Sequence, residues 1–297
     1  MLNSKNQLTL VPTEGLTNRM RTMASAIAFC QEQGMSLSII WQKHKECYCH
    51  FTDLFQPLSP SGVKGFRFRE KRWFDLFYYL RPRRRYLYLA KLMHWFKSDV
   101  CMHFTQLNHI AEHYQGAALG QHMASLLKGK KALLFSCFRM CDYPDALNAA
   151  LFKPTEEIEQ RIRQRLAPIK HAFIGVHIRR TDHYLSKTYS TIDTFVDEMK
   201  KAEQMHQGAH FYLATDDDEV KQRMQQEFPG RVHYAESTAS RTSVEGMKEA
   251  VVDLFALARA DYFIGSFASS FSRMVLALNG AKGVIAKSPD APRDWQS

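Results

Sequence analysis

Residues 172–286 alternate between short apolar runs and helical patterns, and this alternation restricts the fold more than any other feature of the chain. The apolar runs are rich in β-branched and aromatic residues, as is typical of strands buried on both faces of a parallel sheet. Strands that alternate with helices predict a doubly wound parallel sheet. The expected strands are 172–178, 210–214, 231–234, 261–265 and 284–286.

The N-terminal half begins with the same kind of unit. A helical pattern follows the first apolar run and continues to Gly34, which is a helix stop signal. The expected strands of this half are 8–11, 36–41 and 131–138. A chain of 297 residues is long enough for two domains of ordinary size. We therefore expect two Rossmann-like domains, 1–165 and 166–297.

The composition favours a folded chain with an anionic partner. Apolar residues make up 45% of the chain, and no apolar run approaches the ~20 residues that a membrane span needs. The N-terminus lacks the basic-then-apolar layout of a signal peptide, so we expect a cytoplasmic protein whose six cysteines are free thiols. The net charge of +10 favours a nucleotide, a nucleic acid or an anionic lipid surface.

The most basic stretch of the chain is 64–97, where eleven Lys or Arg residues are interspersed with eleven aromatic ones. We expect a helical insertion whose aromatic side packs into the core and whose basic face is exposed. Contact with an anionic membrane, a polyanionic acceptor or a nucleic acid are the functional alternatives. Membrane contact would place the protein at the periphery of the inner membrane.

Polar sequences follow three of the expected strands in the C-terminal half. They are 177–182 (HIRRTD), 215–218 (TDDD) and 265–270 (GSFASS). The carboxyl ends of parallel strands meet at one edge of the sheet, where ligands bind. Arginine matches phosphate oxygens two at a time, and a small-residue loop at a helix N-terminus holds phosphate with its N–H groups. An Arg–Asp turn and a helix cap by Thr215 and Asp218 are the structural alternatives.

A second candidate anion site is the loop before the first helix, which contains Gly15, Asn18 and Arg19. An ordinary helix cap by Thr17 or Asn18 explains the same residues. The chain contains no dinucleotide fingerprint, no P-loop and no nucleophile elbow. Arginines, hydroxyls and backbone N–H groups must therefore bind the anion.

Two further features have competing interpretations. Asp253 is the one carboxylate in an otherwise apolar helical pattern, and it either faces solvent or accepts hydrogen bonds from a bound base. The run from His109 to His113 matches the H-x-x-E-H pattern of inverted zinc peptidases. No convincing third ligand follows it, so we expect surface histidines and assign no metal site.

Several of these stretches, taken in order, resemble the motifs of the α-1,6-fucosyltransferases and the related protein O-fucosyltransferases. They are 177–182, 212–217 and 253–270, while 15–19 and 53–55 are similar to bacterial members. The resemblance implies an α/β, GT-B-like fold with two Rossmann-like domains whose parallel sheets face across a cleft. It also implies inverting, metal-independent transfer of fucose from GDP-fucose to a glycan or glycolipid acceptor.

The resemblance also implies roles for individual residues. Arg179 would hold the β-phosphate with help from Ser269, while His177 and Asp253 would contact the ribose and guanine. The catalytic residues would be Arg179, Arg180 and Asp182. The donor-binding residues would be Gly15, Asn18, Arg19, His177, Arg179, Asp216, Asp217, Asp253, Ser266, Ser269 and Ser270.

One departure from the family pattern concerns the general base. Lys187 stands where the core-type enzymes have a glutamate, and a cationic amine is unsuited to that task. His183, Glu14 and Asp182 are the substitutes. Two other functions stay open: an enzyme that uses another GDP-sugar, and a basic nucleic-acid- or membrane-binding protein on a degenerate transferase fold. For the transferase we expect no nucleic-acid partner and no cofactor.

Overall fold

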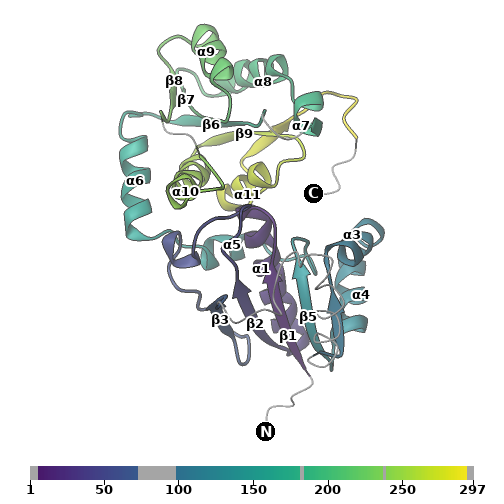
Figure 1. Ribbon diagram of the computed structural model, residues 1–297. Coiled ribbons are helices and arrows are strands. Elements are labelled where there is room, and N and C mark those ends of the chain that lie inside the picture. Colours follow the sequence, from purple (N-terminus) through teal and green to yellow (C-terminus); the bar gives the residue numbers. More distant parts are fainter. Residues whose placement is uncertain (1–5, 73–97, 181–183, 237–238, 293–297) are drawn as a thin grey trace. The chain divides into compact units, whose positions relative to one another are not determined.

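The computed structural model describes residues 6–72, 98–180, 184–236 and 239–292, and it divides into two compact units, 1–153 and 154–297. Within these described ranges each unit contains a five-stranded sheet whose strands are all parallel (Figure 1). The doubly wound α/β architecture predicted for the C-terminal half is therefore present in both halves. No helix in the described ranges is both long and apolar enough to cross a membrane.

The first unit is built around a central strand flanked by parallel neighbours. Its strand order is β3-β2-β1-β5-β4. The strands are β1 (Gln7–Pro12), β2 (Ser36–Trp41), β3 (Arg67–Glu70), β4 (Val100–Met102) and β5 (Lys131–Ser136). The helices are α1 (Leu16–Gln33), α3 (Phe104–His113), α4 (Ala117–Leu127) and α5 (Ala146–Leu151), with a short 3-10 turn at Phe51–Asp53. Helix α1 ends at Gly34, whose left-handed φ of 61° lets its N–H bond back to Cys30 and Gln31.

The basic stretch 64–97 is only partly described, and its described part differs from expectation. Arg67–Glu70 is strand β3, which pairs in parallel with β2 at the edge of the sheet, rather than part of a helix. Its alternating arginine and phenylalanine side chains suit a strand, because successive residues point to opposite faces. Phe68 accordingly packs against Phe51, with ring centroids 4.8 Å apart. The expected helical remainder, 73–97, lies outside the described residues.

The second unit repeats the pattern with strand order β10-β9-β6-β7-β8. The strands are β6 (Phe173–Ile178), β7 (His210–Thr215), β8 (Val232–Tyr234), β9 (Tyr262–Ser266) and β10 (Gly283–Ala286). The helices are α6 (Glu156–Leu166), α7 (Tyr184–Tyr189), α8 (Ile192–Met205), α9 (Asp218–Glu227), α10 (Val244–Ala258) and α11 (Ser270–Asn279). All five strands expected from the sequence are present.

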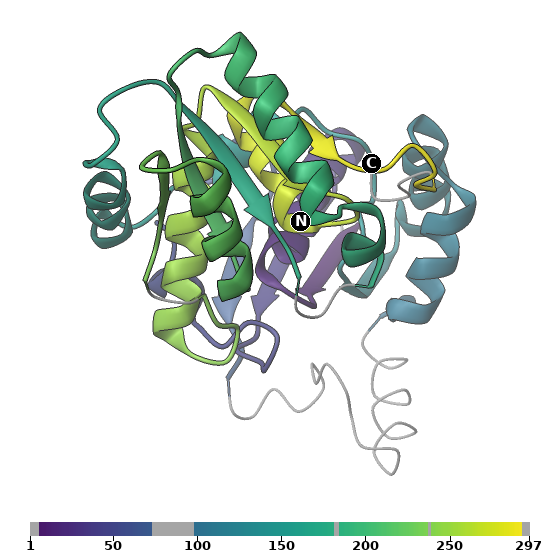
Figure 2. The same cartoon turned by 90° about the horizontal axis from the view of Figure 1, so that it is seen from above.

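Helices cover both faces of the second sheet, with α8 and α9 on one side and α10 and α11 on the other (Figure 1). In the view from above, the green helices α8 and α9 lie over the strands (Figure 2). All six residues of β6 are buried. Ile174, Val176 and Ile178 belong to the core cluster that includes side chains of α8 and α9. Because side chains alternate along a strand, Gly175 and His177 face the opposite layer.

The boundary between the units falls at 153/154, whereas the sequence analysis placed it after 165. Helix α6 accounts for the difference, because its polar side chains pair with those of α10. Arg161 contacts Glu245 and Glu249, and Lys248 lies 2.7 Å from Glu157. The α6 sequence shows a charged, amphipathic helix but not which sheet it covers.

The six cysteines are free thiols, as expected, and Cys101 is the only one that is not fully buried. Burial raises the pKa of the Cys137 and Cys141 thiols to about 12. Both thiols are therefore uncharged at neutral pH, which is consistent with a packing role.

Gly175 provides a test of how tightly β6 packs against α10. A Cβ at this position would lie 3.1 Å from Ala260 Cβ and 3.1 Å from Leu257 Cδ2. We expect Gly175→Val to lower the free energy of unfolding by about 1–3 kcal/mol, since overpacking forces the two layers apart. Urea denaturation followed by circular dichroism measures the change.

The matched control is Gly208→Asn in the same unit. Gly208 has a φ of +73°, which asparagine tolerates, and nothing lies within 4 Å of the position that a Cβ would occupy there. Its free energy of unfolding should change by less than about 0.5 kcal/mol. Equal stability of both variants would contradict the close contact between β6 and α10.

Candidate functional site

The ends of three neighbouring strands are tied together at the carboxyl edge of the second sheet. The Arg179 backbone N–H donates to Ser266 Oγ over 2.9 Å, and the same hydroxyl donates to the His177 carbonyl over 3.0 Å. On the other side, the Arg180 N–H donates to Asp216 Oδ1 at 2.8 Å. The structure therefore brings together the residues that the sequence placed at this edge.

His177 is a buried, neutral histidine. Its Nδ1 lies 2.7 Å from Ser272 Oγ, and its ring stacks on Phe271 with centroids 4.6 Å apart. Burial, reinforced by the positive charge of Arg179, lowers the pKa of His177 to about 3. The imidazole is therefore uncharged at neutral pH and offers hydrogen bonds rather than a positive charge.

The loop between β9 and α11 combines strain with a helix cap. Ala268 has a φ of 53°, a left-handed conformation that non-glycine residues rarely adopt. Ser269 caps α11, because its Oγ accepts the Ser272 N–H at 3.3 Å. Such strain persists only where the surroundings hold the backbone in place, and it is frequent at functional sites. The N-terminus of α11 thus presents its N–H groups at the carboxyl edge of the sheet, as an anion site requires.

Two serines that the sequence analysis missed hold this loop from the α7 segment. Ser186 Oγ donates to the Phe267 carbonyl at 2.6 Å, and Ser190 Oγ accepts the Phe267 N–H at 2.8 Å. Both serines are buried. Ser272, which bonds His177, was missed as well. The only sequence signal for these residues is their small polar type, which is equally common in caps and turns.

Several expected site residues serve to build the edge. Ser266 was expected to bind a ligand, but its hydroxyl is engaged with the backbones of His177 and Arg179. Asp217 caps α9 by accepting the Glu219 N–H at 3.0 Å, in place of the expected cap by Thr215 and Asp218. Arg180 Nη1 donates to the Ser190 carbonyl at 3.2 Å, which agrees with an organising role.

The remaining expected residues of this edge are Ser270, Asp182, His183 and Lys187. Ser270, the first residue of α11, is partly buried beside Ser269. Asp182 and His183 lie outside the described residues. Lys187, in the position of the expected base, is exposed on α7.

In the first unit, the loop before α1 is shaped by a buried arginine. Arg19 Nε donates to the Glu14 carbonyl at 2.8 Å and Nη1 to the Gln42 carbonyl at 2.6 Å, while the guanidinium lies 4.8 Å from the Trp41 ring. Burial lowers the pKa of Arg19. Its side chain has no exposed surface, and its hydrogen bonds to two backbone carbonyls support the loop.

The other expected residues of this loop are more accessible. Gly15 precedes α1 without a side-chain cap, and nothing lies within 4 Å of the position its Cβ would occupy. Asn18 Oδ1 accepts Arg21 Nη2 at 3.1 Å, and the same nitrogen bonds the Cys137 carbonyl at 3.2 Å. Glu14 adopts a left-handed φ of 63°. The loop therefore combines strain with open space at Gly15.

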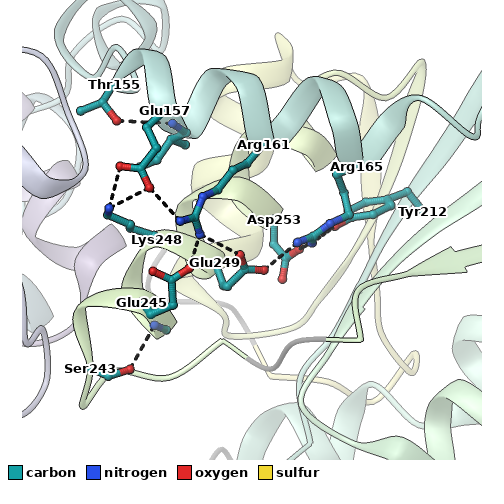
Figure 3. A network of polar contacts seen from close by, with 12 residues as sticks. Thr155, Glu157, Arg161, Arg165, Tyr212, Ser243, Glu245, Lys248, Glu249 and Asp253 are labelled. Atoms are coloured by element: carbon teal, nitrogen blue, oxygen red, sulfur yellow. Dashed lines mark hydrogen bonds and ion pairs between the residues drawn. The ribbon is translucent and has the colours of Figure 1, made fainter.

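Asp253 belongs to a network of polar side chains between α6, α10 and β7 (Figure 3). Its Oδ1 accepts the Tyr212 hydroxyl at 2.6 Å and Arg165 Nη1 at 3.0 Å. Arg165 Nη2 donates to Glu249 at 2.6 Å. Burial raises the pKa of Asp253 to about 6, against the opposing effects of Tyr212 and Arg165. Sequence reasoning singled out Asp253 but missed both of its partners.

The H-x-x-E-H run lies on α3, at the surface. His109, Glu112 and His113 are the one group in the described ranges whose possible metal-ligand atoms lie close together, within 4.8 Å of one another. All three side chains are exposed, as expected. His113 Nδ1 lies 2.8 Å from the His109 carbonyl, and Glu112 accepts a hydrogen bond from Asn108. These contacts within the helix account for the arrangement.

Residues 69–279 match the sequence profile of the GDP-fucose protein O-fucosyltransferase family. The match covers more than two thirds of the chain, including β4 and β5 of the first sheet and, apart from β10, the strands of the second, so this protein belongs to that family. It is a glycosyltransferase of the fucosyltransferase superfamily. Among curated protein sequences, none matches the chain.

Solved structures show the same fold. The NodZ α-1,6-fucosyltransferase soaked with GDP-fucose aligns with a TM-score of 0.60 and 18% identity, over 92% of each chain. NodZ from Bradyrhizobium aligns with a TM-score of 0.61 and 17% identity, over 91% of this chain and 92% of that one. POFUT1 in complex with GDP-fucose aligns with a TM-score of 0.55 and 12% identity, over 96% of this chain and 99% of that one. The predicted GT-B-like fold is confirmed.

The ionisation of Asp253 predicts a pH-dependent stability. Because its pKa rises from 3.8 to about 6 on folding, the native state binds this proton more tightly than the unfolded state does. The contribution of Asp253 to the free energy of unfolding therefore falls as the pH rises from about 4 to 6 and then stays constant. Asparagine cannot ionise. Between pH 5 and pH 7 the free energy of unfolding of Asp253→Asn should therefore rise by about 1 kcal/mol relative to that of wild type.

Urea denaturation of both proteins across this pH range measures the difference. The comparison at pH 4.5, where the native carboxyl is protonated, serves as the reference. Stability curves that run parallel from pH 4.5 to pH 7 would contradict the raised pKa.

Proposed function

We propose that this enzyme transfers fucose from GDP-fucose to a glycan or glycolipid acceptor, with inversion at the sugar carbon and without a metal ion. One observation carries the proposal: Ser266 joins Arg179 and His177 to the loop that begins α11, at the carboxyl edge of the second sheet. Family membership supports GDP-fucose as the donor, as do the NodZ and POFUT1 structures obtained with that nucleotide sugar.

The chemistry of the transfer explains why an arginine belongs at this position. As the bond between the sugar carbon and the diphosphate oxygen breaks, negative charge develops on the departing GDP. The Arg179 guanidinium supplies a permanent charge with paired donors, and the N-terminus of α11 with Ser269 supplies further N–H groups. Donors fixed in place before the reaction stabilise this charge without reorganisation. In this proposal they do the work that a metal ion does in other transferases.

The nucleoside is held by residues of a different kind. The neutral His177 hydrogen-bonds the ribose without competing with Arg179 for the phosphate charge. Asp253 accepts hydrogen bonds from guanine. Arg180, Asp216 and Asp217 hold the strand ends around the donor.

The acceptor side of the reaction needs a general base. Lys187 is exposed and carries a positive charge, so it does not replace the glutamate base. His183, Glu14 and Asp182 are the alternatives for that role.

We further propose a bacterial, cytoplasmic enzyme, with the basic stretch 64–97 providing peripheral contact with an anionic membrane. Use of another GDP-sugar is the second candidate function, since the residues above recognise GDP rather than fucose.

The donor is tested by calorimetric titration of the purified protein with GDP, GDP-fucose, GDP-mannose and a UDP-sugar, with EDTA present. We expect binding of GDP and GDP-fucose but not of the UDP-sugar. Binding of GDP-mannose as tight as that of GDP-fucose would favour the second candidate function. A protein that binds none of these nucleotides would contradict the transferase.

Arg179→Ala tests the role of the arginine in the reaction. Because Arg179 acts on charge that develops in the transition state, the variant should lose about 10²–10³-fold in kcat, more than it loses in donor affinity. Single-turnover transfer or donor hydrolysis in EDTA measures the rate. Arg163→Ala, an exposed arginine on α6, is the matched control and should retain the wild-type rate. Near-normal turnover of Arg179→Ala would refute the assignment.

A further inference from the structure

Within the described part of the chain, the Asp253 carboxylate is hydrogen-bonded through only one of its two oxygens. Oδ1 accepts both the Tyr212 hydroxyl and Arg165 Nη1, at 2.6 and 3.0 Å. A carboxylate oxygen has about two lone-pair sites, so these two donors fill Oδ1. Among the residues that the structure describes, no hydrogen bond reaches Oδ2. The side chain nevertheless keeps 13% of its surface exposed.

The two donors are fixed by contacts of their own, so the carboxylate has a single orientation. Arg165 Nη1 also donates to the Tyr212 hydroxyl at 3.0 Å, which closes a triangle of three side chains from α6, β7 and α10 (Figure 3). The second arginine nitrogen bonds Glu249, and Arg161 contacts that glutamate in turn. Tyr212 is fully buried.

The same neighbours control the charge of Asp253. Burial and the negative charge of Glu249 raise the pKa of Asp253, while Tyr212, Arg165 and Lys221 lower it, and the balance lies at about 6. The carboxyl is therefore mostly ionised at pH 7. Loss of either donor to Oδ1 removes a lowering influence, so the pKa then rises into the neutral range.

We propose that Tyr212 and Arg165 are positioning residues that keep Asp253 ionised, with Oδ2 presented to the base, and thereby set the preference for guanine. This inference rests on the proposed function, in which Asp253 contacts the base of GDP. Guanine presents N–H donors on its pairing edge, whereas adenine presents an unprotonated ring nitrogen there. An ionised carboxylate oxygen attracts the N–H donors of guanine and repels the unprotonated ring nitrogen of adenine. A protonated carboxyl donates a hydrogen bond and loses this discrimination.

The test is calorimetric titration with GDP and with ADP at pH 6.5 and pH 8.5. Tyr212→Phe removes the hydroxyl and keeps the ring. At pH 6.5 we expect this variant to bind GDP about threefold more weakly than wild type, with a smaller ratio of ADP to GDP dissociation constants. A rise of about one unit in the pKa of Asp253, from about 6, lowers its ionised fraction at pH 6.5 from about three-quarters to about one-quarter. At pH 8.5 the carboxyl ionises again, so the affinity should return to within about twofold of wild type. Asp253→Asn should lack the discrimination at both pH values.

A second variant tests the arginine independently of the tyrosine. Arg165→Met should change the affinities in the same direction and with the same pH dependence. Arg163→Met, an exposed position on the same helix, is its matched control. Tyr262→Phe on β9, where the ring packs near His206, is the control for the tyrosine. Both controls should retain the wild-type discrimination, and thermal unfolding identifies any variant that does not fold.

The outcomes separate this inference from the proposed function. A wild-type protein that binds no GDP contradicts the proposed function itself. If wild type binds GDP and both Tyr212→Phe and Arg165→Met keep its discrimination at both pH values, the inference is overturned and the cluster only stabilises the fold. A loss that is equal at pH 6.5 and pH 8.5 also overturns it, because a purely structural defect does not recover with ionisation.

Discussion

The hydroxyl of Ser266 is the contact on which the candidate site depends. It accepts from the Arg179 backbone and donates to the His177 carbonyl, so it joins the end of β9 to the end of β6 after the sheet pairing has stopped. Without it, a buried carbonyl and a partly buried N–H would lose their partner, at a cost of about 1–3 kcal/mol for the buried group. The direction in which the chain leaves β6, and with it the start of the Arg179 side chain, follows from this hydrogen bond.

The loop between β9 and α11 is likewise held by hydrogen bonds from serine side chains. Ala268 is strained, and its neighbour Phe267 is bonded on both backbone groups by Ser186 and Ser190. Ser190 in turn donates to the Ala286 carbonyl at 2.5 Å. Short serine side chains lose little rotamer entropy on burial, so they fix a loop at a lower entropic cost than long polar side chains do. The N-terminal end of α11 is therefore organised before any ligand arrives, which is the condition for electrostatic catalysis.

The sequence predicted all five strands of the second sheet and β1, β2 and β5 of the first, because each is a short apolar run between polar residues, but it missed β3 and β4. It also placed Arg179, Asp216 and Ser269 at one edge, since parallel strands share their carboxyl edge. It failed where the deciding contact is remote. The partners of Asp253 are 41 and 88 positions away along the chain. The predicted position of the boundary between the units differs from the observed one for the same reason. The pairing of α6 with α10 places α6 in the second unit, and the two helices are far apart in the sequence. The basic composition around β3 concealed the strand alternation of Arg67–Glu70.

Two buried ionisable groups in the second unit differ in how their environment sets their charge. Near His177 the positive charge of Arg179 adds to desolvation, and both favour the neutral form. Around Asp253, desolvation favours the neutral form while Arg165 and Tyr212 favour the charged one, so the pKa lies close to the physiological range. A group in the first situation is insensitive to small changes in its surroundings. A group in the second is sensitive to each neighbour, and for that reason the identities of residues 165 and 212 matter for the charge of Asp253 even though neither needs to touch a ligand.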